Sequence, residues 1–121
     1  MVIAKPSNQL SERSTVTVDT GATQSAIINM AGRHPVGIFI PAEFNAGAIT
    51  FEVGYDGTTM FDLYDNAEAV YDIAIPVVGA MMQIDPQLFR GALYMRLTCA
   101  VAQTATPTDF VVMFAEPNKN F

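Results

Sequence analysis

The chain has 121 residues, of which 50% are hydrophobic, and its six basic and twelve acidic residues give a net charge of −6. This length predicts one domain with a core of its own. The acidic balance argues against nucleic acid or an anionic membrane surface as a partner, because both require clustered Lys and Arg. We also expect no membrane span, since the most apolar stretch is interrupted by Asp72 and Pro76.

Short apolar runs with alternating or β-branched residues predict strands throughout the chain. They lie at 14–19, 24–30, 35–41, 49–55, 59–64, 69–75, 77–84, 92–102 and 109–116. Turn residues separate them at the spacing of about 8–12 residues that is typical of a sandwich or barrel. Between two of the runs, 85–91 combines Asp, Pro and a final Gly, which predicts one helical or 3₁₀ turn.

The ends of the chain differ from this pattern. Residues 1–13 are polar and aperiodic. We therefore predict an extended N-terminal arm at 1–13, an antiparallel β-sandwich domain at 14–116 and a C-terminal tail at 117–121. The arm's composition suits a segment that orders on binding a partner.

The stretch ITFEVGYDGTTMFDLYD, at 49–65, predicts a hairpin around Asp56-Gly57. A three-residue loop at 55–57 places one set of apolar residues on a single face: Ile49, Phe51, Val53, Phe61 and Leu63. A two-residue loop would mix a carboxylate into that face, and burial favours the first register. Gly57 then takes a left-handed conformation, and Asp56 accepts hydrogen bonds from nearby backbone N–H groups. Both are predicted to be structural turn residues.

The residue types that carry chemistry are scarce. The single histidine, His34, and the single cysteine, Cys99, do not form a nucleophilic triad or a zinc site within one chain, and one cysteine excludes an intramolecular disulfide. A calcium site is an alternative reading of the acids at 56–68, but the EF-hand spacing is absent. We expect no enzymatic activity, no metal and no cofactor.

Two compositional features leave alternatives open. Eight acids and no Lys or Arg lie between Glu43 and Asp85, which suits either a solvated acidic face or a surface that complements itself in a symmetric oligomer. The seven methionines are either core filler or, at Met60, Met81 and Met82, part of an exposed contact surface.

The hairpin EVGYDGTTMFDLYD resembles the hairpins of small jelly-roll β-sandwich domains in tailed-phage virion proteins. A weaker similarity extends to discoidin-like and carbohydrate-binding modules. PVGIFIPAEFNAGAITFEV and IDPQLFRGALYMRL match the phage group in order and spacing, so the resemblance covers about Pro35 to Leu97. It implies a jelly-roll topology for the sandwich.

The phage proteins of this kind are head decoration (cement) proteins and other minor structural proteins. The resemblance implies a homo-oligomer, a trimer or dimer, that is assembled in the host cytoplasm and binds the major capsid protein on the virion exterior. Expected contact residues are Lys5 and Arg13 in the arm and Tyr55, Met60 and Tyr64 at the hairpin. Two alternatives remain: a glycan-binding module that uses exposed tyrosines, and a neck or tail component.

Overall fold

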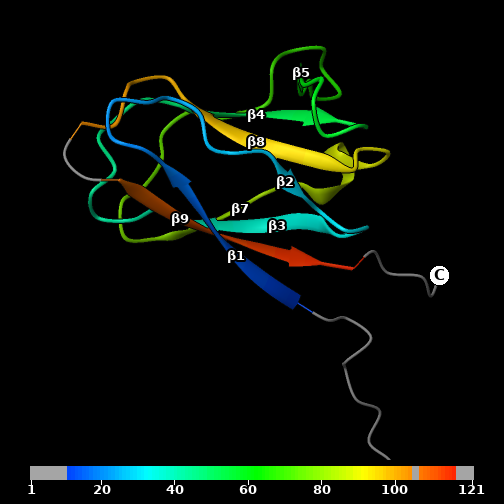
Figure 1. The fold of residues 1–121 in the computed structure, drawn as a ribbon, viewed down its shortest axis with the longest axis horizontal. Coiled ribbons are helices and arrows are strands. Elements are labelled where there is room, and N and C mark those ends of the chain that lie inside the picture. Colours follow the sequence, from blue (N-terminus) through cyan, green and yellow to red (C-terminus); the bar gives the residue numbers. More distant parts are fainter. Residues whose placement is uncertain (1–10, 105–106, 117–121) are drawn as a thin grey trace, which may run out of the picture.

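The fold is all-β in the computed structural model, which describes residues 11–104 and 107–116. Its elements are β1 Ser11–Val18, β2 Ile28–Asn29, β3 His34–Phe39, β4 Ile49–Gly54, β5 Phe61–Asp62, β6 Asp72–Ile73, β7 Met81–Gln83, the 3₁₀ turn η2 Pro86–Phe89, β8 Tyr94–Cys99 and β9 Thr108–Ala115. Every predicted run overlaps one of these strands. Two antiparallel sheets pack together, which confirms the predicted β-sandwich (Figure 1).

The strands are paired in a nested order around the middle of the chain. Sheet A has the order β1-β9-β3-β7, and sheet B has the order β2-β8-β4-β5 with β6 also on β4. Thus β1 pairs with β9, β2 with β8, β3 with β7 and β4 with β6. Two further pairings, β3 with β9 and β4 with β8, join these pairs into sheets.

The core lies between the sheets, where alternate residues of each long strand point inward. Ile38, Phe51, Leu97 and Val112 are fully buried and represent the four central strands. The turn η2 adds Phe89, whose ring meets that of Phe51 edge-on at a centroid distance of 5.7 Å. Burial of such side chains contributes about 1.5–3 kcal/mol each, so this layer supplies most of the stability.

The turn η2 forms as its sequence predicts. The Asp85 side chain accepts a hydrogen bond from the Gln87 N–H at 3.0 Å, and Pro86 occupies the first position of the turn. Capping of this kind satisfies an N–H group that the short turn leaves without a backbone partner.

The domain boundaries differ from the prediction at the start of the sandwich. Strand β1 begins at Ser11, so residues 11–13 belong to sheet A and pair with the end of β9. The remaining part of the predicted arm, 1–10, and the predicted tail, 117–121, lie outside the described residues.

The predicted hairpin register is wrong by two residues, although the face is right. Val53 pairs with Phe61, and Leu63 donates its N–H to the Phe51 carbonyl at 3.1 Å, whereas the three-residue loop placed Phe61 opposite Phe51. The cause lies at Gly54, where the Thr59 carbonyl occupies the space of the missing side chain. The chain therefore crosses over Gly54 before the second strand begins.

One consequence is that Phe61 is exposed, not buried as predicted. Its partner Val53 is near the end of β4 and is only partly buried. Leu63 takes the inward position that the prediction gave to Phe61.

A buried amide, that of Gln103, joins three loops at one end of the sandwich. Its Oε1 accepts the Asn45 N–H at 2.9 Å and the Thr108 hydroxyl at 3.2 Å, while its Nε2 donates to the Val101 carbonyl at 2.9 Å. Its backbone N–H donates to the Ala22 carbonyl at 3.0 Å. Side-chain hydrogen bonds thus replace the strand ladder where the chain changes sheets.

We predict that Gln103→Leu lowers the free energy of unfolding by about 2–4 kcal/mol, because the buried Thr108 hydroxyl and two partly buried backbone groups lose their partner. Gln83→Leu, at an exposed position of β7, is the matched control and should change stability by less than about 0.5 kcal/mol. Urea unfolding of both variants measures the difference. Equal effects would mean that the Gln103 bonds add nothing beyond side-chain volume.

Candidate functional site

Three of the eight acids in the central segment hold turns. Asp56, Asp65 and Asp85 each accept the N–H of the residue two positions later, at 3.0, 2.8 and 3.0 Å. This is the usual side-chain bond of Asp in tight turns. These three carboxylates therefore have structural partners in the fold.

At the hairpin tip, Asp56 and Gly57 act together. Asp56 Oδ1 accepts the N–H groups of Thr59 at 2.8 Å and Thr58 at 3.0 Å. The bonds from Thr59 and then from Thr58 hold the pKa of Asp56 below its ordinary value. The stabilising contribution of the carboxylate is therefore present above the ordinary Asp range and is lost as the pH falls through the lowered pKa. Gly57 has a φ of +80°.

We predict that Gly57→Ala lowers the free energy of unfolding by about 2 kcal/mol. The left-handed backbone accounts for about half of this, and the new methyl group would also lie 3.2 Å from Cε2 of Tyr94. Gly21→Ala is the matched control: its φ is +83°, but its methyl group would meet no atom within 4 Å. Urea unfolding measures both variants. If Gly57→Ala lowers the free energy of unfolding no more than Gly21→Ala does, the contact with Tyr94 adds no destabilisation.

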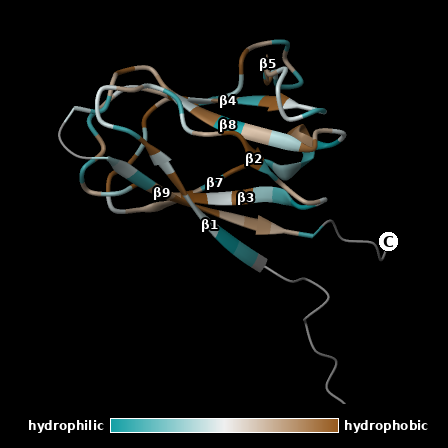
Figure 2. Cartoon of the chain, viewed as in Figure 1, coloured by the Kyte–Doolittle hydropathy of each residue, from teal (hydrophilic) through white to brown (hydrophobic). Residues whose placement is uncertain are grey.

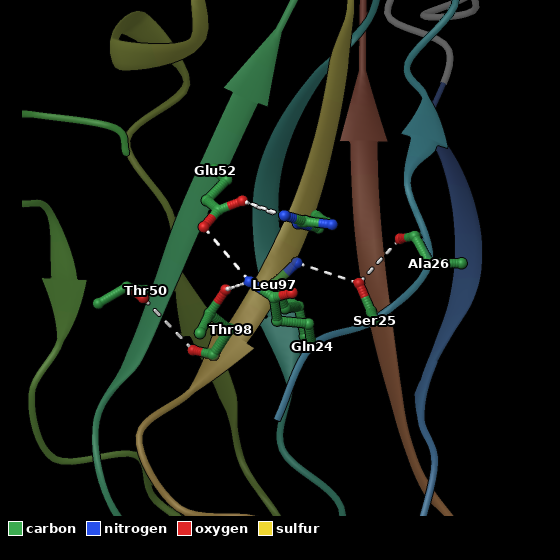
Figure 3. A network of polar contacts seen from close by, with 8 residues as sticks. Gln24, Ser25, Ala26, Thr50, Glu52, Leu97 and Thr98 are labelled. Atoms are coloured by element: carbon green, nitrogen blue, oxygen red, sulfur yellow. Dashed lines mark hydrogen bonds and ion pairs between the residues drawn. The ribbon is translucent and has the colours of Figure 1, made fainter. Parts of the chain in front are cut away.

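The outer face of sheet B carries a polar network (Figure 3). Glu52 lies opposite Arg96 in the β4–β8 ladder, and their Oε1 and Nη2 atoms are 2.7 Å apart. Gln24 Nε2 donates to the other Glu52 oxygen at 3.3 Å and to the Thr98 hydroxyl at 3.5 Å. Cross-strand pairs of this kind stabilise a sheet by about 0.2–1 kcal/mol each.

Ser25 extends the network to the edge of sheet B. Its N–H donates to the Leu97 carbonyl, and its hydroxyl accepts the Leu97 N–H, both at 3.1 Å. The hydroxyl donates in turn to the Ala26 carbonyl at 2.9 Å (Figure 3). Ser25 therefore continues the hydrogen bonding to β8 beyond the end of the short strand β2.

The two remaining candidates for chemistry are His34, which is half-buried, and Cys99, which is buried. Burial and then the charge of Arg90 lower the pKa of His34, and burial raises the pKa of Cys99 to about 11. Over 11–104 and 107–116, no three His, Cys, Asp or Glu residues lie close enough together to hold a metal ion. No helix in that part of the chain is long and apolar enough to cross a membrane.

The predicted contact residues do not form one site. Tyr55 is 62% exposed and stacks on Phe61 with a centroid distance of 6.1 Å, and Tyr64 is also exposed. Met60 is half-buried, with its sulfur over Gly54. Arg13 lies on sheet A, away from the hairpin in sheet B, and Lys5 lies outside the described residues.

An apolar row crosses the outer face of sheet A. The ladder places Met81 beside Phe39, Phe39 beside Val111 and Val111 beside Thr15. We call these four residues the sheet A stripe. Figure 2 shows the hydrophilic start of β1 at the border of the more apolar strand β9. The neighbours of these residues along each strand point into the core, so the stripe faces outward.

The segment between β6 and β7 continues this apolar surface. Ile75 is 79% exposed, and Val77 and Val78 are also exposed. The segment lies against the end of β3, because the Gly79 N–H donates to the Ile40 carbonyl at 2.7 Å. We call 75–78 the apolar loop.

Sequence patterns did not predict most of this apolar surface. Of the two alternatives left open for the methionines, the exposed surface holds for Met81, which is 48% exposed, whereas Met82 packs partly against the core. The strand predicted at 77–84 is much shorter, at Met81–Gln83, which frees the preceding apolar residues. The signal was available in Pro76 and Gly79, which bracket two valines that do not alternate with polar residues.

Comparisons of the chain with protein families, with curated proteins and with solved structures found no match.

Proposed function

We propose that the chain is a structural protein of a tailed-phage virion, a head decoration protein that binds the outer surface of the major capsid protein shell. The observation that carries this proposal is an outward-facing apolar surface. In the sheet A stripe, Met81 is exposed and Phe39 and Val111 are half-buried, and the apolar loop adds further exposed side chains. Exposed Met, aromatic and aliphatic groups of this kind are typical of surfaces that bind other proteins.

We further infer a jelly-roll topology. The support is the nested order, in which β1 pairs with β9, β2 with β8, β3 with β7 and β4 with β6. A long hairpin that is rolled into two sheets produces this order, and jelly rolls are double sheets of the same kind. The topology agrees with the resemblance of 35–97 to phage jelly-roll proteins.

The proposed mechanism is mass action at the shell. A homo-oligomer on the virion exterior that spans neighbouring capsid subunits binds the closed shell more tightly than separated subunits. Simultaneous contacts by several copies raise the effective affinity. No catalytic step is part of this proposal, and neither nucleic acid nor a membrane is a partner.

We predict that the purified chain co-sediments with heads built from the major capsid protein of the same genome and saturates at a fixed ratio. Met81→Lys should weaken this binding at least tenfold, because it places a charge in the contact surface. Leu93→Lys is the matched control, since Leu93 is equally exposed but lies next to sheet B. Absence of binding, or equal losses for both variants, would contradict the proposal.

The same assay tests the arm. Deletion should be limited to residues 2–10, because residues 11–13 are part of β1. If the arm binds the capsid, the deletion lowers the number of copies bound per head while the thermal stability of the chain is unchanged.

Electron microscopy of labelled particles distinguishes binding to the shell from binding to the neck. Labelling confined to one vertex would favour a neck or tail component.

A glycan-binding module is a second candidate, favoured by the exposed stack of Tyr55 on Phe61. Sugar rings pack on such exposed aromatic faces. In this case Tyr55→Ala and Tyr64→Ala would reduce retention on a column of host polysaccharide, and Tyr71→Ala, at a ring stacked in the core on Phe51, would serve only as a folding control. Retention that is absent, or unchanged in both variants, would remove this candidate.

A further inference from the structure

We propose that two copies of the chain associate through the free edges of their β1 strands, in an antiparallel pairing around a two-fold axis normal to sheet A. The inference deepens the homo-oligomer part of the proposed function by naming its interface. It does not depend on capsid binding. The combined sheet would run from β7 of one copy to β7 of the other.

The first observation is that β1 is the one long edge strand among the described residues. It has eight residues and pairs with β9 without a register shift. The strands at the other edges are short: β7 has three residues, and β2, β5 and β6 have two each. Short edge strands are a common protection against edge-to-edge pairing, and β1 lacks it.

The second observation is the sequence of the edge, SERSTVTV. It contains no proline, no lysine and no bulge, which are the other devices that block an edge. Glu12 shares the strand parity of the buried Val16 and Val18 but is exposed, and it forms an ion pair with Arg33 at 2.7 Å. Within the described part of the chain, the β1 backbone makes hydrogen bonds with β9 alone.

Symmetry restricts the register of such a pair. A two-fold axis normal to the sheet keeps outward side chains opposite outward ones, so Arg13, Thr15 and Thr17 pair among themselves. The two registers that use most of the strand place Arg13 opposite either Thr15 or Thr17 of the second copy. With Thr15, the two arginines would be diagonal neighbours about 7–8 Å apart, which is unfavourable for like charges.

In the other register, Arg13 lies opposite Thr17 of the second copy, and a carboxylate lies nearby. The Thr17 hydroxyl donates to Asp109 Oδ1 at 2.6 Å, so the carboxylate lies beside Thr17 and one strand spacing further, about 4.8 Å. Within one copy, Arg13 and Asp109 are four residues apart along the ladder, about 13 Å. Their charges therefore complement each other between copies and not within one.

This register also joins the apolar surfaces. Thr15 would lie opposite Thr15 of the second copy, and the sheet A stripe would continue across the junction from Met81 to Met81. The dimer would thus present one continuous row on its outer face.

A cysteine at the axis tests the register. Thr15→Cys should form a disulfide-linked dimer on mild oxidation, because paired Cα atoms in antiparallel strands are about 4.5–5.5 Å apart, within the range of a disulfide. Thr17→Cys is the matched control and should stay monomeric on denaturing gels, since its two copies would be about 13 Å apart. The native Cys99 is buried and does not compete.

A charge exchange tests the ion pair in the full chain. Arg13→Asp and Asp109→Arg should each raise the dimer dissociation constant at least tenfold in sedimentation equilibrium, and the double variant should return it to within about threefold of the original. Arg90→Asp, an exposed arginine near the η2 turn, should have no effect.

Several outcomes overturn the inference: a monomer or a trimer at all concentrations, equal cross-linking of both cysteine variants, or a double variant as weak as the single ones. A monomer that still co-sediments with capsids overturns the edge pairing and leaves the proposed function. A dimer with the stated register that binds no capsid supports the edge pairing and contradicts the proposed function.

Discussion

The sandwich depends on two central strand pairings, β3 with β9 and β4 with β8. Each joins the first half of the chain to the second, and every other strand is attached to one of these four: β1 to β9, β7 to β3, β2 to β8, and β5 and β6 to β4. The fully buried residues Ile38, Phe51, Leu97 and Val112 lie on their inner faces. Contacts this distant in sequence carry a loop-closure cost that burial of the core must offset.

The same constraint explains the polar residues. A chain that changes sheets repeatedly leaves backbone groups without ladder partners at each crossing, and these must be paired elsewhere. Asp56, Asp65 and Asp85 do this in turns, and Gln103 does it between three loops. Three of the eight acids between Glu43 and Asp85 are thus explained by the tight turns of a short chain.

Sequence patterns located the strands because alternation reports directly which side chains face a core. They located pairings poorly. The 49–65 hairpin has the predicted parity, because burial of Phe51 and Leu63 requires it, but its register is set by the contact of Thr59 with Gly54, which alternation does not encode. The nested order and the role of Gln103 depend on segments far apart in sequence. For the same reason, the sheet A stripe is visible only after four strands are placed side by side.

The two outer faces of the sandwich are chemically different. On sheet B, Arg96 and Gln24 both bond to the Glu52 carboxylate, so the outer face carries a polar network. On sheet A, the stripe of Phe39, Val111 and Met81 faces outward beside the long edge of β1. Among the described residues, the β1 backbone bonds to β9 alone. An apolar face next to such an edge favours association, because burying the face and pairing the edge both lower the free energy. The proposed assembly with other chains therefore uses sheet A, where the stripe and the β1 edge belong to the same sheet.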